Sequence, residues 1–148
     1  MTLTHLSLLA ILVPDYDAGI AFYSGVLGFD LLEDTDMGDG KRWVRVAPKG
    51  AQRDTSPKGA QRDTLPKGAQ TEFLLARAVG DQTDAIGNQG GGRVWLFVRS
   101  DDFDADHARL TSKGVHFEEP PRNEPYGKVV VFRDPFGNRW DLLGPAKV

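Results

Sequence analysis

The feature that most constrains the fold is a motif that occurs twice. Asp15-Tyr16-Asp17-Ala18 and Asp102-Phe103-Asp104-Ala105 lie 87 positions apart, and each follows an apolar run and precedes residues at helical spacing. After each predicted helix come segments rich in β-branched and aromatic residues, which favour strands. Each half therefore has the pattern β-α-β-β-β. A repeated unit of this size favours one pseudo-symmetric domain over a solenoid.

The same patterns give bounds for the individual elements. In the first half we expect strands over residues 6–13, 29–34, 41–47 and 71–76, with a helix that is capped by Asp15 or Asp17 and closed by Gly28. In the second half we expect strands over 93–98, 115–118, 129–132 and 140–143, a helix over 102–113 and a loop over 120–127. The predicted fold class is α+β: two βαβββ modules form a curved mixed sheet around a cleft, with the helices on the outer face.

These elements predict one domain over 1–148, with module one over 1–78, a linker over 79–92 and module two over 93–145. Within module one, residues 48–56 (PKGAQRDTS) are repeated at 57–65 with Leu65 as the changed residue, and 66–70 begin a third copy. We interpret the repeat at 48–70 as a tandem duplication of 18 residues in a hairpin loop. Its cations outnumber its anions by three, so a basic flap, a partner-binding arm and a loop without a role all stay open.

Composition narrows the class of partner. The net charge of −3 gives no reason to expect nucleic acid, and no apolar run approaches the ~18 residues that a membrane span needs. The absence of cysteine excludes disulfides and thiolate metal sites, and the N-terminus lacks the pattern of a signal peptide. We therefore expect a cytoplasmic protein without nucleic-acid or membrane partners.

The most informative single residue is Asp141. The turn residues Asp134 to Asn138 predict a tight hairpin, and the strand after it carries Asp141 on the face opposite Trp140 and Leu142. A carboxyl in a buried strand needs a partner. Asp141 is therefore either a ligand-binding residue or half of an ion pair, for which Arg93 and Arg139 are the candidate cations.

Two motifs carry a family resemblance. Ala21-Phe22-Tyr23 through Leu27-Gly28-Phe29, and Asp134-Pro135-Phe136-Gly137-Asn138, resemble the vicinal oxygen chelate superfamily, which includes glyoxalase I, extradiol dioxygenases and bleomycin resistance proteins. The resemblance implies a homodimer. It also implies a divalent metal bound by residues on the first and last strands of each module.

The metal positions of the family are only half matched. The last-strand positions correspond to Glu72 and Asp141, but the first-strand positions correspond to Leu8 and Trp95, which cannot bind a metal. His5 lies three residues before Leu8 and so points to the other face of the strand. We therefore predict no cofactor; if a divalent metal is present, Glu72, Asp141 and His5 are its candidate ligands.

An apolar, aromatic groove with carboxylates and an arginine suits a flat or cationic organic molecule. The predicted ligand-binding residues are Glu72, Arg93, Trp95, Phe97, Asp141, Tyr126 and Trp43. Core packing of the aromatic residues, ion pairing of Glu72 and Asp141 with Arg93 or Arg139, and a turn-anchoring role for Tyr126 are the structural alternatives. The predicted function is metal-independent binding of a small molecule, as in bleomycin resistance proteins. A metal-dependent lyase, isomerase or dioxygenase of the glyoxalase type is the alternative, and its catalytic residues are not identified.

Overall fold

The computed structural model describes residues 1–50 and 71–145, so the predicted insertion at 48–70 falls almost wholly outside the described residues. The chain divides into two compact units. Unit one holds Met1–Ile11 and Asp15–Arg77, and unit two holds Leu12–Pro14 and Ala78–Val148. In place of one continuous sheet, the strands are hydrogen-bonded in two sheets, one for each β-α-β-β-β pattern. The α+β fold class is confirmed.

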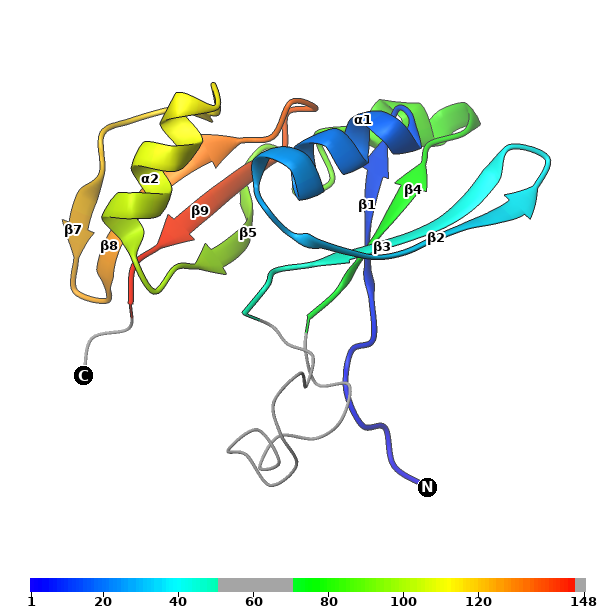
Figure 1. Ribbon diagram of the computed structural model, residues 1–148, viewed down its shortest axis with the longest axis horizontal. Helices are drawn as coiled ribbons and strands as arrows, with labels where there is room; N and C mark the ends of the chain where they lie inside the picture. Colours follow the sequence, from blue (N-terminus) through cyan, green and yellow to red (C-terminus); the bar gives the residue numbers. More distant parts are fainter. Residues whose placement is uncertain (51–70, 146–148) are drawn as a thin grey trace. The chain divides into compact units, whose positions relative to one another are not determined.

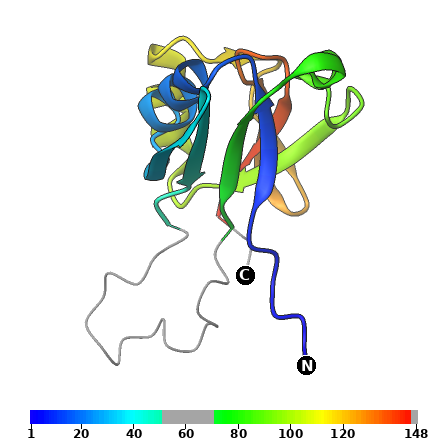
Figure 2. The ribbon, with the colours of Figure 1, turned by 90° about the vertical axis from the view of Figure 1, so that its right-hand side faces the viewer.

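The first sheet has four strands in the order β1-β4-β3-β2, and β1 lies beside β4 (Figures 1 and 2). The strands are β1 (Leu9–Val13), β2 (Asp30–Gly38), β3 (Lys41–Ala47) and β4 (Phe73–Arg77). The predicted helix is observed as α1 (Tyr16–Ile20), which continues directly as a π-helical segment, Ala21–Val26. Asp15 is the N-cap, since its Oδ1 accepts a hydrogen bond from the Ala18 N–H at 2.8 Å.

The core of unit one lies on the helix side of this sheet. Alternate residues of β3 and β4 are fully or almost fully buried, namely Val44, Val46, Phe73 and Leu75. Phe73 stacks on Phe29, which in turn packs against Tyr23 of the π-helical segment. By the two-residue period of a strand, the intervening residues of β3 and β4 point to the opposite face.

The second sheet joins β5 (Val94–Arg99), β9 (Arg139–Leu143), β8 (Gly127–Arg133) and β6 (His116–Phe117) in that order. Strand β7 (Arg122–Glu124) also pairs with β8, so the predicted loop at 120–127 was wrong in that it contains a short strand. The helix predicted over 102–113 is observed as α2 (Phe103–Ser112), with Asp102 as its N-cap, and Gly114 follows its end with φ +82°.

A chain of aromatic rings connects this sheet to α2. Trp140 stacks on Phe132 at 5.8 Å between ring centroids, Phe132 meets Phe117 edge-on, and His107 lies between Phe117 and Phe103. His107 is therefore a half-buried packing residue. The rings also fix the orientation of β9, because Trp140 must face α2 and its neighbour Asp141 must face away.

The predicted linker is more ordered than a plain connector. It contains a 3-10 helix, Gly80–Ala85, and then packs closely on the hairpin turn of unit two. A Cβ at Gly87 would overlap the carbonyl of Phe136, and one at Gly90 would lie 2.6 Å from the Cβ of Trp95. Glycine at 87 and 90 thus lets the linker backbone lie against the Phe136 carbonyl and the Trp95 side chain, a contact that sequence periodicity could not predict. Among the described helices, none is both long and apolar enough to cross a membrane.

Candidate functional site

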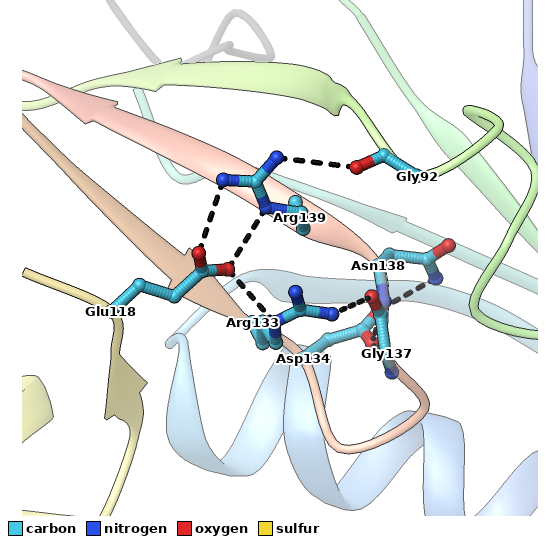
Figure 3. Close-up of polar contacts among 7 residues, drawn as sticks. All are labelled: Gly92, Glu118, Arg133, Asp134, Gly137, Asn138 and Arg139. Carbon is cyan, nitrogen blue, oxygen red and sulfur yellow. Dashed lines mark hydrogen bonds and ion pairs between the residues drawn. The ribbon is translucent and has the colours of Figure 1, made fainter.

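The strand that carries Asp141 begins at a turn organised by one buried carboxylate. Asp134 Oδ1 accepts hydrogen bonds from the N–H groups of Phe136, Gly137 and Asn138 at 2.9–3.0 Å. Its Oδ2 accepts a fourth from the Asn138 side chain at 2.7 Å (Figure 3). Gly137 adopts φ +113°, a conformation that glycine tolerates. The turn predicted from Asp134 to Asn138 is therefore a rigid support for the start of β9.

The register of the second sheet sets the neighbours of Asp141. Its Cα is paired with Phe97 of β5 on one side and with Val131 of β8 on the other. All three side chains lie on the face opposite α2, as the sequence predicted for Phe97 and Asp141. We call this the open face of unit two, after the exposed side chain of Phe97, although Val131 and Asp141 themselves are buried. It is defined by Phe97, Val131, Asp141, Arg122 and Arg139.

Asp141 is buried, and its carboxyl has no hydrogen-bond partner among residues 1–50 and 71–145. Its residue surface is 6% exposed, and its Oδ1 accepts no hydrogen bond from the described part of the chain. Burial raises the pKa of its carboxyl above the ordinary aspartate value, since removal from water disfavours the charged form. Arg122 and Arg139 oppose this rise in pKa, whereas Glu119 adds to it.

The surrounding charges on this face already have partners. Arg139 donates two hydrogen bonds to the carboxylate of Glu118 at 2.9 and 3.0 Å, and Arg133 donates to the same carboxylate at 2.8 Å (Figure 3). The Arg139 hydrogen bond lowers the pKa of Glu118. Arg139 therefore does not form the predicted ion pair with Asp141, because its planar guanidinium is already matched to Glu118.

Arg122 is neutralised in the same way. Its Nε donates to Glu119 at 2.8 Å and its Nη1 to Glu124 at 2.5 Å. These two hydrogen bonds and a weaker one with Tyr126 raise the pKa of the guanidinium. Asp141 thus lies near two arginines without forming an ion pair with either in the described structure.

The other predicted residues of unit two differ in accessibility. Phe97 is 58% exposed and Tyr126 is 50% exposed, so plain core packing does not account for Phe97. Trp95 is half-buried beside Gly90, and Arg93 precedes β5 on the surface. Tyr126 lies in the turn between β7 and β8, where it contacts Arg122, so it also fits the turn-anchoring alternative.

In unit one the predicted residues are Glu72 and Trp43. Glu72 accepts a hydrogen bond from Arg45 Nη1 at 2.5 Å, and the Nε of Arg45 donates to Glu33 at 2.9 Å. Trp43 is half-buried two residues before Arg45 on the same face of β3. The ion-pair alternative for Glu72 is therefore observed, but its cation is Arg45, whereas the sequence analysis suggested Arg93 or Arg139.

The described residues do not fit the metal that the family resemblance implies. His5 is exposed in the N-terminal segment and hydrogen-bonds Thr4, while the carboxylate of Glu72 is engaged by Arg45. Leu8 and Trp95 hold the remaining positions, and no group of three or more His, Asp or Glu side chains suited to a metal lies within residues 1–50 and 71–145. We derive no reaction step through a metal.

Sequence reasoning missed the charged residues that surround Asp141. Arg122 lies in the predicted loop at 120–127, and Glu118 and Glu119 lie at and just after the end of the predicted strand at 115–118, where the direction of a side chain is hard to assign. The signal that could have identified Arg122 is its alternation with Glu124, which is typical of a short strand.

Comparison with known proteins now identifies the family. Residues 3–142 match the Glyoxalase/Bleomycin resistance protein/Dioxygenase superfamily, and the chain belongs to it. The chain is 44% identical over 137 residues to an uncharacterized protein of Shewanella frigidimarina, with 91% of this chain and 89% of the relative covered.

Two solved structures from Streptomyces sp. CB03234 are also similar. The chain is 33% identical to TnmS3, described as an antibiotic binding protein, with a TM-score of 0.69 and 99% of each chain covered. It is also 33% identical to a glyoxalase/bleomycin resistance protein, with a TM-score of 0.63 and coverage of 92% of this chain and 96% of that one.

Proposed function

We propose that this protein binds a small organic molecule in the manner of the bleomycin resistance proteins, without catalysing a reaction and without a metal. The observation that carries the proposal is the 33% identity to an antibiotic binding protein over 99% of both chains. The ligand is aromatic or cationic. The predicted binding residues in unit two are Phe97, Asp141, Trp95, Arg93 and Tyr126, and those in unit one are Glu72 and Trp43.

The chemistry of the open face supports this proposal over the glyoxalase-type alternative. A solvent-exposed phenyl ring beside a buried carboxyl can hold a flat molecule and orient one polar group on it. By contrast, Glu72 is held by Arg45, and a divalent ion would have to displace that guanidinium. Metal analysis of protein purified without chelator tests the alternative. One equivalent of tightly held metal that is lost in Glu72→Ala would favour the enzyme.

The direct test is a ligand titration. Bleomycin and a panel of planar aromatic antibiotics are titrated into the protein, with tryptophan fluorescence and equilibrium dialysis as independent readouts. We expect saturable binding of at least one compound, which comes out of the titration chemically unchanged. Phe97→Ala should weaken that binding, whereas Met37→Ala, which removes a similarly exposed apolar side chain in unit one, should not. Absence of binding across the panel, or turnover of a bound compound, would contradict the proposal.

Two further proposals concern assembly and the repeat. We propose a homodimer on the family resemblance, and sedimentation should then give twice the mass of 16.2 kDa. We also propose that the repeat at 48–70 is a tandem duplication without a role in folding. Deletion of two nine-residue copies should leave the melting temperature almost unchanged, since loop closure depends only weakly on loop length. A cytoplasmic location stays a prediction.

A further inference from the structure

The open face of unit two contains one acidic side chain whose charge is not matched by a cation. Each arginine near it has another partner: Arg122 binds Glu119 and Glu124, while Arg133 and Arg139 bind Glu118. Asp141 forms no ion pair in the described structure, and its buried Oδ1 accepts no hydrogen bond there. A buried carboxylate in this state is costly, and a group that supplied a positive charge would relieve the cost.

The residue paired with Asp141 supplies a second recognition element. Phe97 is its partner in the parallel β5–β9 ladder, so the two side chains lie next to each other on one face. The ring of Phe97 is 58% exposed, although a phenyl side chain gains free energy from burial. A flat ring could cover Phe97, and a cation close to that ring would also be attracted by its π face.

We propose that Asp141 and Phe97 together recognise a protonated amine carried on a flat aromatic ring system. This inference rests on the proposed function. It narrows the ligand from a molecule that is aromatic or cationic to a molecule that is both aromatic and cationic. The ligand ring lies against Phe97 while its ammonium group donates to the Asp141 carboxylate. Because Oδ1 is covered in the free protein, the ammonium group donates to Oδ2. Glu72 is not the acceptor of the ammonium group, since Arg45 already neutralises its charge.

The experiment compares two probes of nearly equal shape. 9-Aminoacridine is a planar amine that is protonated at pH 7, and acridone is its neutral counterpart. Both are titrated by calorimetry into the wild-type protein and into the variants Asp141→Asn, Phe97→Ala and Asp104→Asn. Asp104 is the matched control, because its loss changes the charge of the same unit equally, but its carboxylate is 80% exposed and pairs with Lys128. Circular dichroism confirms that each variant is folded.

We expect the wild type to bind 9-aminoacridine more tightly than acridone. Asp141→Asn should weaken 9-aminoacridine about tenfold or more, which is the scale of a charge-assisted hydrogen bond, and should change acridone less than twofold. Phe97→Ala should weaken both probes, and Asp104→Asn should weaken neither.

Equal affinity of the wild type for the two probes, or equal loss of both in Asp141→Asn, would overturn the inference. The same titrations with neutral and anionic aromatic antibiotics distinguish a failure of the amine inference from a failure of the proposed function. If those compounds bind while 9-aminoacridine does not, the amine inference fails and the proposed function stands. If nothing binds, both fail.

Discussion

The family resemblance assigns Glu72 and Asp141 to corresponding positions of the two modules, and the surroundings of the two carboxylates differ. In unit one, Glu72 is held by Arg45, which also binds Glu33, so two carboxylates share one guanidinium. In unit two, the arginines beside Asp141 are bound to Glu118, Glu119 and Glu124, and Asp141 is left without a counter-charge in the described structure. The carboxylate thus pairs with a cation in the first module and with none in the described part of the second, which is why we propose Asp141 as the residue that meets a cationic ligand.

The largest expected loss of stability comes from disrupting the turn that places Asp141. Asp134→Ala deletes the acceptor of three backbone N–H groups and one side-chain amide in a buried turn. We expect a loss of about 3–5 kcal/mol in the free energy of unfolding, because several buried donors lose their partner at once. Urea denaturation measures it. A loss below about 1 kcal/mol would show that the turn does not depend on this carboxylate.

A second substitution tests how the turn is held from the side of the predicted linker. Gly87→Ala places a Cβ on the Phe136 carbonyl at φ +72°, whereas Gly91→Ala meets no atom within 4 Å at φ +71°. Both variants bear the strain of a left-handed alanine, about 1 kcal/mol. Gly87→Ala should cost about 2 kcal/mol more, through overpacking. Equal melting temperatures for the two variants would contradict the close approach.

The first module is tested by removing its shared cation. Arg45→Met leaves Glu33 and Glu72 facing each other without a counter-charge, so we expect a loss of about 1–2 kcal/mol, between the values for exposed and buried pairs. Lys49→Met is the control, because Lys49 is 72% exposed in its pair with Asp30 and should change stability by less than about 0.5 kcal/mol. Equal losses would mean that Glu72 is as weakly held as a surface carboxylate.

The smallest expected effect on stability is that of Asp141→Asn, which should stabilise the protein, whereas the substitutions above destabilise it. Burial raises its carboxyl pKa, so the stability contribution of Asp141 is present at acidic pH and is lost as the pH rises through the folded-state pKa. Asp141→Asn should therefore stabilise the protein at pH 7, by no more than about 1 kcal/mol because the amide also lacks a partner, and the gain should vanish toward pH 3.

Glu118→Gln should behave in the reverse way. The hydrogen bonds from Arg139 and Arg133 lower the pKa of Glu118, so its contribution is present above the unfolded-state pKa and is lost as the pH falls. The variant should be less stable than the wild type at pH 7, with a difference that shrinks below about pH 4. Chemical denaturation across this pH range measures the free energy of unfolding of both variants. If Asp141→Asn and Glu118→Gln change it in the same direction at pH 7, the contrast between the unpaired Asp141 and the paired Glu118 would be contradicted.

The sequence was sufficient for the fold but only partly sufficient for the site. The N-cap at Asp15, one of the two predicted candidates, and the alternation that places Asp141 opposite Trp140 depend on local signals, and both predictions are confirmed. The pairing of Glu72 with Arg45 depends on the register between β3 and β4, which no local signal encodes. The same holds for Arg139, whose choice of Glu118 over Asp141 depends on where the chain after β6 passes.

The most direct measurement is an NMR titration of the Asp141 side-chain carboxyl, with and without 9-aminoacridine. In the free protein we predict a pKa above the ordinary aspartate value, because the carboxyl is buried without a partner. Saturation with the amine should lower this pKa, since a positive charge then lies beside the carboxylate. A pKa in the free protein at or below the ordinary value, or one that the bound amine leaves unchanged, would contradict the account.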